Sequence, residues 1–280
     1  MARKRYGFDE AKIDKYLKDG RGQGEGATYK PWLTVQDVPS TGRSSRVLGC
    51  KTGRIHHFLS DLETRYFYLL DWSDDIADVR EQYPLPRVET KALAATLGIR
   101  HPQDPSTKTD IVVTTDFLIT MAPELGGSLR ARAIKPAKDL DNPRVLEKLQ
   151  IEKAYWEQVG VDWGIVTDLD IDPTVATNIA LFHNHKMLSE DNLPGVDLQH
   201  MKEALLQQIK MADPKTPHTK FCMALDKALA APLGSSLTVL YHLVADKAVR
   251  APLEEAINSK TPIGLFRLHN VVSHISWKRA

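Results

Sequence analysis

The sequence has little cysteine and no long hydrophobic run, and each shortage excludes a class of protein. Only two cysteines, Cys50 and Cys222, occur in 280 residues, and they lie far apart. Such a pair argues against a disulfide framework, favours a reducing, cytoplasmic location, and offers no cluster of thiol ligands for a structural zinc ion. No stretch approaches the roughly 20 apolar residues of a membrane-spanning helix, so no membrane segment is expected.

Sequence motifs of several enzyme classes are also missing. The chain contains neither Gly-x-Ser-x-Gly nor His-Glu-x-x-His, which argues against the corresponding serine hydrolases and zinc proteases. Glycines at positions 20, 22, 24 and 26 resemble a phosphate-binding loop, but no strand precedes them and no Lys-Ser/Thr follows, so an ordinary loop is predicted. His56 and His57 are adjacent and would point to opposite faces of a strand, which favours packing or surface roles over joint metal binding.

Charge is nearly balanced overall but not along the chain. The net charge is +1, yet residues 1–60 hold 12 Lys and Arg against 6 Asp and Glu. Residues 260–280 add four basic residues and no acid. Basic ends around a nearly neutral body favour a polyanionic partner, although a solvated charged surface explains the same counts. The basic start, Met1-Ala-Arg-Lys-Arg-Tyr6, is not followed by an apolar core, so no secretory signal is expected.

Hydrophobic periodicity divides the chain into a mixed region and a helical region. In the first part, helices are predicted over 7–19, 60–72, 92–97 and 144–158. Strands are predicted there over 78–84, 111–119, 130–135 and 163–167. In the second part, helices are predicted near 174–188, 197–211, 218–230 and 236–249, with a short strand over 263–268. These patterns predict an α/β domain over residues 1–168, with a mixed sheet flanked by helices, and a small, mostly α domain over 169–280. A winged-helix module and a plain helical bundle both fit the second domain.

An aspartate within an apolar strand is the first candidate for chemistry. Asp116 interrupts the apolar run 111–119, and a lone buried carboxylate is costly unless a cation or N–H groups compensate its charge. Lys135 ends the next predicted strand, and an antiparallel pair with a turn near 121–129 would bring both side chains to one edge. Metal-dependent nucleases of the restriction type use such an acid to hold Mg²⁺ and such a lysine to stabilise charge near the attacking water and phosphate. A structural ion pair explains the same spacing.

Other carboxylates could complete such a site. Glu63 follows Ser60 by three residues, so it either completes a helix capping box or supplies a metal ligand. Glu152, on the predicted helix 144–158, is a possible supporting acid, and Glu147 is the same residue type on the same helix. Simple exposure on the helix surface is the alternative for both. Two carboxylates, a backbone carbonyl and a substrate phosphate are enough for Mg²⁺, which keeps several of its waters.

Nine short segments follow one another in an order that is shared with one known family. The segments are Gly20-Arg-Gly-Gln-Gly24, Pro31-Trp-Leu-Thr-Val-Gln36, Gly42-Arg-Ser44, Lys51-Thr-Gly-Arg-Ile-His-His57, Leu59-Ser-Asp-Leu-Glu63, Asp78-Val-Arg-Glu-Gln-Tyr-Pro84, Thr115-Asp-Phe-Leu118, Ile134-Lys-Pro-Ala137 and Leu146-Glu-Lys-Leu149. In this combination the chain resembles the TnsA-type transposon endonucleases, subunits of heteromeric bacterial cut-and-paste transposases. The resemblance is close over residues 5–170 and weak beyond them.

The resemblance implies both a fold and a set of site residues. It implies a restriction-endonuclease-like fold for the first domain, with Glu63, Asp116 and Lys135 as the catalytic set. Glu152 matches a further acid near the metal site of the family. The implied cofactor is Mg²⁺, as two ions, for which Mn²⁺ would substitute.

The strand that carries the lysine departs from the family pattern. The family usually has Gln-x-Lys, whereas this chain has Ala133-Ile-Lys135. The glutamine side chain is therefore missing, and the contact it would make is missing with it. The backbone carbonyl of Ile134 remains as an implied metal ligand beside Glu63, Asp116 and Glu152.

The implied function is cleavage of DNA during transposition. The resemblance implies a subunit that cuts the 5′ ends of the transposon, while a DDE-type recombinase partner cuts and joins the 3′ ends. The implied partners are transposon-end DNA, that recombinase, and an AAA+ transposition regulator contacted by the second domain. Two alternatives stay open: a free-standing restriction or repair nuclease, and a non-catalytic DNA-binding assembly subunit with a decayed nuclease fold.

Overall fold

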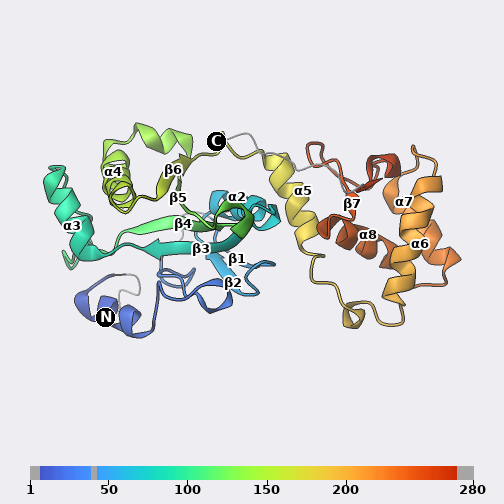
Figure 1. Ribbon diagram of the computed structural model, residues 1–280, viewed down its shortest axis with the longest axis horizontal. Coiled ribbons are helices and arrows are strands. Elements are labelled where there is room, and N and C mark those ends of the chain that lie inside the picture. Colours follow the sequence, from blue (N-terminus) through green and yellow to red (C-terminus); the bar gives the residue numbers. More distant parts are fainter. Residues whose placement is uncertain (1–6, 39–42, 270–280) are drawn as a thin grey trace. The chain divides into compact units, whose positions relative to one another are not determined.

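The computed structural model describes residues 7–38 and 43–269, and the chain divides into two compact units, residues 1–171 and 172–280 (Figure 1). The predicted boundary, between residues 168 and 169, lies three residues earlier. The first unit is α/β with a mixed sheet and the second is mainly helical, which confirms the predicted class of each. Among the helices of the described residues, none combines the length and the apolar character needed to cross a membrane.

The N-terminal unit is built around a four-stranded sheet with the order β3-β4-β5-β6. Strand β4 pairs antiparallel with both β3 and β5, whereas β5 pairs in parallel with β6. A separate two-stranded ladder joins β1 and β2. The helices and strands of this unit are α1 (Glu10–Lys18), β1 (Ser45–Leu48), β2 (Ile55–Phe58), α2 (Asp61–Trp72), β3 (Ile76–Pro84), α3 (Arg87–Thr96), β4 (Thr114–Met121), β5 (Leu129–Ile134), α4 (Pro143–Gln158) and β6 (Asp162–Val166).

Helices cover both faces of this sheet (Figure 1). Tyr66 of α2 meets Phe117 of β4 edge to face, with ring centroids 5.5 Å apart. Trp156 of α4 packs in a buried cluster with Leu118 and Ala131 of the sheet. Because Phe117 and Leu118 are consecutive in a strand, their side chains point to opposite faces. Helices α2 and α4 therefore enclose the middle of β4, the strand that carries Asp116.

Most predicted elements of this unit are present, with shifted ends. The antiparallel pair of β4 and β5, joined through a turn at Gly126-Gly127, confirms the predicted strand pair. The predicted strand 111–119 is wrong at its start, because β4 begins at Thr114 and residues 111–113 border a pocket instead. The third helix begins at Arg87, earlier than the predicted Ala92, directly after Pro86.

The glycine-rich segment is a loop, as predicted, and it packs against the sheet. Gly22 has φ +79°, and a β-carbon there would lie 2.1 Å from Cγ of Pro84 in β3. Its N–H donates to the carbonyl of Lys30 at 2.6 Å, and the N–H of Lys30 donates to the carbonyl of Gln23 at 3.1 Å. The close approach requires glycine and brings the following segment, with Trp32, alongside β3.

The C-terminal unit is a small helical assembly with one short β-ladder. Its elements are α5 (Pro173–His183), α6 (Leu198–Met211), α7 (His218–Ala228), α8 (Ser235–Ala245), β7 (Val249–Arg250) and β8 (Arg267–Leu268). Helix α5 begins where predicted, since Asp172 caps it by accepting from the N–H groups of Thr174 and Val175. Helix α8 lies at the centre, packed against α5, α6 and α7, and it buries Val239, Leu240, Leu243 and Val244.

Three predictions for this unit are wrong in extent. The helix predicted over 174–188 ends at His183. The helix predicted over 236–249 ends at Ala245, and Val249 belongs to β7. The strand predicted over 263–268 is a 3₁₀ turn at Ile263–Leu265 followed by the two residues of β8. At the turn, the N–H groups of Ile263 and Gly264 donate to the carbonyls of Thr216 and Pro214, so these residues bond to a loop instead of a neighbouring strand.

Candidate active site

Asp116 lies where two strands of the sheet separate. The ladder between β4 and β5 ends at the pair Phe117 and Arg132, and Asp116 is the next residue of β4 beyond that end. The carboxylate of Asp116 then accepts the N–H of Ile134 at 2.7 Å and the ammonium of Lys135 at 2.7 Å, both at Oδ2. The predicted convergence of the acid and the lysine is therefore present, and the two form the ion pair that was the structural alternative.

Glu63 takes part in the cap of α2, which was one of its two predicted roles, and its role as a metal ligand stays a prediction. Ser60 caps α2 by accepting the N–H of Glu63, and the Ser60 hydroxyl donates to Oε1 of Glu63 at 2.8 Å. The N–H of Leu59 donates to Oε2 at 3.0 Å. These bonds hold the carboxylate at the N-terminus of the helix, where the helix dipole favours negative charge. Oε2 also lies 3.5 Å from the amide nitrogen of Gln82, which in turn lies 3.5 Å from Oδ1 of Asp116.

The two glutamates of α4 that the sequence could not distinguish lie in different environments. Glu152 is buried, and its Oε1 accepts from the indole N–H of Trp163 at 3.1 Å. It borders the same pocket as Asp116 and Lys135. Glu147 instead forms a surface ion pair with Arg144. The exposed-helix alternative thus holds for Glu147 and is wrong for Glu152.

Together, Glu63, Asp116, Lys135 and Glu152 form what is called here the carboxylate cluster, in which three acids face one amine. Burial, followed by the charge of Asp116, raises the pKa of Glu63 to about 7. The same two causes raise the pKa of Glu152 to about 7. Burial acts to lower the pKa of Lys135, but the carboxylates of Asp116, Glu152 and Glu63 outweigh it and raise that pKa, so the lysine stays charged.

The donor atoms of the carboxylate cluster fit a hard divalent cation. Mg²⁺ prefers carboxylate and carbonyl oxygens, and a cation placed among close carboxylates removes the repulsion that raises their pKa values. The carbonyl of Ile134, the implied backbone ligand, is directed toward the cluster, because it accepts from the ammonium of Lys135 at 2.9 Å. Only oxygen donors are needed, and they come from two helices, α2 and α4, and two strands, β4 and β5.

A pocket of about 280 Å³ opens beside the cluster. Its polar end is formed by Asp116, Lys135 and Glu152, and Lys148 adds a second cation. The remaining lining is mainly apolar and comes from the N-terminal segment, the loop before β4 and the start of α4: Phe8, Trp32, Leu33, Pro102, Ile111, Val112, Val113, Thr114, Val145 and Leu149. A polar end with charged groups and an apolar wall is typical of a small-molecule or nucleotide-sized site.

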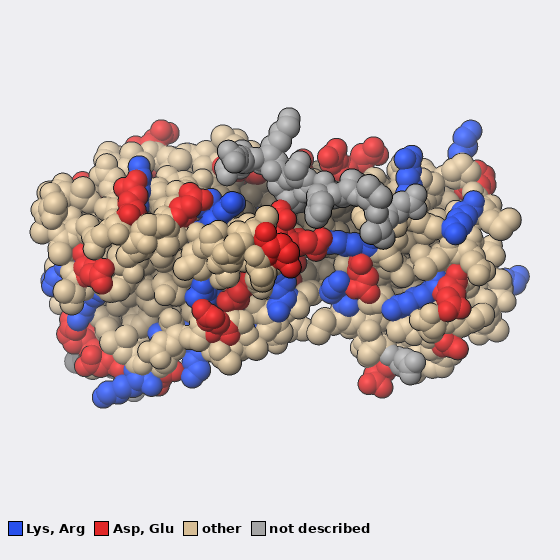
Figure 2. Space-filling model, viewed as in Figure 1, with Lys and Arg blue, Asp and Glu red and all other residues tan. Residues whose placement is uncertain are grey.

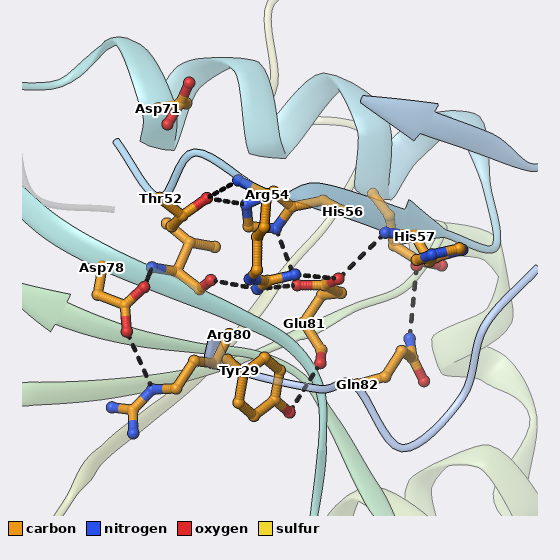
Figure 3. A network of polar contacts seen from close by, with 12 residues as sticks. Tyr29, Thr52, Arg54, His56, His57, Asp71, Asp78, Arg80, Glu81 and Gln82 are labelled. Carbon is orange, nitrogen blue, oxygen red and sulfur yellow. Dashed lines mark hydrogen bonds and ion pairs between the residues drawn. The ribbon is translucent and has the colours of Figure 1, made fainter. Parts of the chain in front are cut away.

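A second buried polar cluster lies next to the first, and the sequence analysis missed it. Figure 3 shows Arg54 and His56 directed at Glu81 of β3. The two guanidinium nitrogens of Arg54 donate to the two carboxylate oxygens of Glu81 at 2.8 and 2.6 Å, and Nδ1 of His56 lies 2.8 Å from Oε2. These hydrogen bonds to Arg54 and His56 outweigh burial, the largest single effect, and lower the pKa of Glu81 to about 2. The packing role predicted for the histidine pair is confirmed for His56, which is fully buried.

The surface charge does not gather by sign on the face shown in Figure 2. Lys and Arg side chains are interspersed there with Asp and Glu side chains. Of the basic ends noted in the sequence, Lys260 and Arg267 are exposed. Arg3, Lys4, Arg5, Lys278 and Arg279 lie outside the described residues. On this face the structure adds no support for a polyanion-binding surface beyond that of the composition.

Both units of the chain match models of one type of endonuclease. Residues 73–168 match the family model described as TnsA-like endonuclease N terminal, and residues 170–253 match the model described as TnsA endonuclease C terminal. The chain is also similar to the Transposon Tn7 transposition protein TnsA of Escherichia coli, with 45% identity over 188 residues. That match covers 66% of this chain and 67% of the E. coli protein. Asp116, Lys135 and Glu152 all fall within the first matched region.

Proposed function

This chain belongs to the TnsA endonuclease family, and from that premise we propose that its carboxylate cluster is the catalytic centre of a Mg²⁺-dependent nuclease that cuts the 5′ ends of a transposon. An endonuclease acting in transposition needs a site for a scissile phosphate. The observation that carries the proposal is the convergence of Asp116, Lys135 and Glu63 from β4, β5 and α2. Their charges match what phosphodiester hydrolysis requires.

Each residue of the cluster has a distinct proposed task. Glu63, Asp116, Glu152 and the carbonyl of Ile134 would hold Mg²⁺, as two ions, with Mn²⁺ as a substitute. The bound metal would supply Lewis-acid chemistry and a more acidic water. Lys135, kept charged by Asp116, would orient the attacking water and stabilise negative charge on the phosphate. The buried position of Glu63 and Glu152 would keep bulk water from weakening these interactions.

The fold supports the same function. A mixed sheet with an acid on one strand, a lysine on the next and a helix on each face is the arrangement expected of a restriction-endonuclease-like domain, which we propose for residues 1–168. The four helices and the short β7–β8 ladder of the second unit are compatible with a winged-helix-like module that contacts DNA or a partner. The proposed partners are transposon-end DNA, a DDE-type recombinase and an AAA+ regulator. As a protein acting on bacterial DNA, it would work in the cytoplasm.

The test is end cleavage in a reconstituted transposition reaction that contains the recombinase and the regulator. Asp116→Ala is expected to abolish cutting at the 5′ ends, since the anchoring carboxylate is gone, while cutting at the 3′ ends by the recombinase continues. Glu147→Ala, which changes a surface glutamate of α4, is the control and should cut both strands normally. Cutting of the 5′ ends by a folded Asp116→Ala protein would exclude this assignment of the centre.

A comparison of the isolated chain with the full reaction tests the two alternatives. A subunit of a transposase is expected to be nearly inert without its partners, whereas a free-standing nuclease would cut DNA alone. A decayed, non-catalytic subunit would bind no divalent ion at the carboxylate cluster, which calorimetric titration with Mn²⁺ would reveal.

A further inference from the structure

Gln82 occupies an unusual position in the middle of β3. The register of β3 and β4 pairs Glu81 with Phe117 and Tyr83 with Thr115, which sets Gln82 across from Asp116. Its side chain is buried, with 2% of its surface exposed. Its backbone is left-handed, with φ +49°, a conformation that is uncommon for a residue other than glycine. Such backbone strain persists only where the surroundings impose it, and it is concentrated at functional sites.

The side-chain amide of Gln82 stands between two carboxylates of the cluster. Its nitrogen lies 3.5 Å from Oε2 of Glu63 and 3.5 Å from Oδ1 of Asp116, so each of its two N–H groups has an acceptor. The hydroxyl of Thr114 donates to the amide oxygen at 3.3 Å, which sets the amide with its nitrogen toward the acids. Glu63 comes from α2 and Asp116 from β4, and Gln82 contacts both.

The neighbouring residues hold Gln82 in its left-handed conformation. Glu81 is anchored through its carboxylate by Arg54 and His56, and through its carbonyl by the hydroxyl of Tyr29 at 3.0 Å (Figure 3). The carbonyl of Gln82 itself accepts the N–H of Trp32 at 3.2 Å. The buried polar cluster and the N-terminal loop thus fix the backbone on which the amide depends.

We infer that Gln82 is a positioning residue, which holds Glu63 and Asp116 in the convergent arrangement that a divalent cation needs. The inference rests on the proposed function, because it assigns a task within the same site. A neutral amide suits this task. It stabilises two negative carboxylates through hydrogen bonds, yet it adds no positive charge that would compete with the cation.

The experiment measures binding of Mn²⁺ alone to the full chain, by isothermal titration calorimetry at pH 8. Gln82→Met keeps the length of the side chain and removes the amide. It is expected to weaken Mn²⁺ binding by about 10–100-fold, as loss of an outer hydrogen-bond partner of a metal ligand typically does. Gln103→Met is the matched control, because the Gln103 amide also donates to a carboxylate, that of Asp110 at 3.0 Å, on the exposed surface. The control should bind Mn²⁺ as the wild type does.

A second variant separates the amide from the backbone. Gln82→Gly accepts the left-handed conformation readily and removes the amide, so it should show the same loss of affinity even if Gln82→Met folds poorly. Thermal unfolding in EDTA should remain cooperative in Gln82→Gly. In end cleavage, the Mg²⁺ concentration for half-maximal rate should rise by a similar factor, whereas the rate at saturating Mg²⁺ falls less.

The outcomes separate this inference from the proposed function. If Asp116→Ala abolishes Mn²⁺ binding and Gln82→Gly binds it as tightly as the wild type, the role of Gln82 is overturned and the catalytic assignment stands. If the wild type binds no Mn²⁺, or Asp116→Ala binds it unchanged, both are overturned. If the Gln82 variants and Asp116→Ala lose affinity while Gln103→Met does not, both are supported.

Discussion

Two buried clusters lie next to each other in the N-terminal unit: the carboxylate cluster and the buried polar cluster of Arg54, His56 and Glu81. The pKa values of their glutamates are shifted in opposite directions. Glu81, Glu152 and Glu63 are 0%, 5% and 7% exposed, so their burial is nearly equal. The pKa of Glu81 is lowered to about 2, because Arg54 and His56 donate to it. Burial and the charge of Asp116 raise the pKa values of the other two to about 7.

The difference shows that hydrogen-bond and charge partners, more than burial, decide in which direction the pKa of a buried carboxylate is shifted. Hydrogen bonds match the charge of Glu81 itself, and they connect β2, β3 and the N-terminal loop. In the carboxylate cluster three acids share Lys135, and two of them are most stable with a proton or a cation. The first arrangement stabilises the fold, and the second stores unfavourable charge that a bound cation would relieve.

The largest expected effect tests whether the buried polar cluster of Arg54, His56 and Glu81 is structural. Arg54→Met removes both hydrogen bonds to Glu81 and leaves a buried carboxylate with weaker partners. It should lower the free energy of unfolding by about 3–5 kcal/mol, as measured by urea denaturation. Lys153→Met, which breaks the exposed pair with Glu157 on α4, should cost about 1 kcal/mol or less. Equal losses for the two variants would contradict the distinction between matched and surface charges.

The next effect concerns Lys135, the lysine of the carboxylate cluster. Lys135→Ala should lower the rate of 5′-end cleavage by about 10²–10³-fold, because a charge-stabilising group is lost from the reacting phosphate. The rate is measured under single-turnover conditions with saturating Mg²⁺. Lys153→Ala, on the exposed side of α4, is the control and should cleave at the normal rate. A loss below about tenfold for Lys135→Ala would limit this lysine to its ion pair with Asp116.

The pH dependence of stability should differ between wild type and Glu63→Gln in metal-free buffer. In the folded protein the pKa of Glu63 is about 7, against an ordinary value of 4.5, so the folded state keeps a proton that the unfolded state releases. The unfolding free energy of the wild type should therefore fall, relative to the variant, as pH rises from 4.5 to 7. The expected change is on the order of 1–3 kcal/mol.

Denaturation series at several pH values measure this difference directly. Glu147→Gln, at the surface of α4, should run parallel to the wild type across the same range. At pH 8, saturating Mn²⁺ should restore part of the unfolding free energy that the wild type loses in metal-free buffer, because the cation replaces the proton. A difference between wild type and Glu63→Gln that does not change with pH would mean that Glu63 ionises as it does in the unfolded chain.

The smallest effect is expected from loss of a single hydrogen bond to Glu81 in the buried polar cluster. Tyr29→Phe removes the hydroxyl that donates to the carbonyl of Glu81, and it should lower the free energy of unfolding by about 0.5–1.5 kcal/mol. Cleavage by the folded variant at saturating Mg²⁺ should be normal, since neither the carboxylates nor Lys135 is touched. A large loss of cleavage at saturating Mg²⁺ would show that the two clusters are more tightly coupled than their separate bonds indicate.

Local patterns in the sequence predicted much of the fold. The N-cap at Ser60, the apolar run around Asp116 and the long helix before Gly160 each depend on residues within a few positions of one another, and each is present. The ends were predicted less well. Pro86, for example, is followed directly by a helix that was predicted to begin five residues after Arg87.

The candidate site was predicted only in part, because its remaining members give no local signal. Glu147 and Glu152 are alike in the sequence, yet only Glu152 is buried among the pocket residues. Gln82 and Glu81 are consecutive residues of a strand, and nothing in their neighbours indicates that one lies between two carboxylates and the other binds an arginine.

Sequence alone determined which segments become helix and strand, that Asp116 and Lys135 lie on adjacent strands, and to which family the chain is similar, because periodicity, caps and motifs are written in neighbouring residues. Tertiary structure alone decided which acids are paired and which repel, that Gln82 stands between two of them, and that its backbone is left-handed. Those properties depend on burial and on charges brought together from α2, β3, β4, β5 and α4, and only the folded chain specifies such distances.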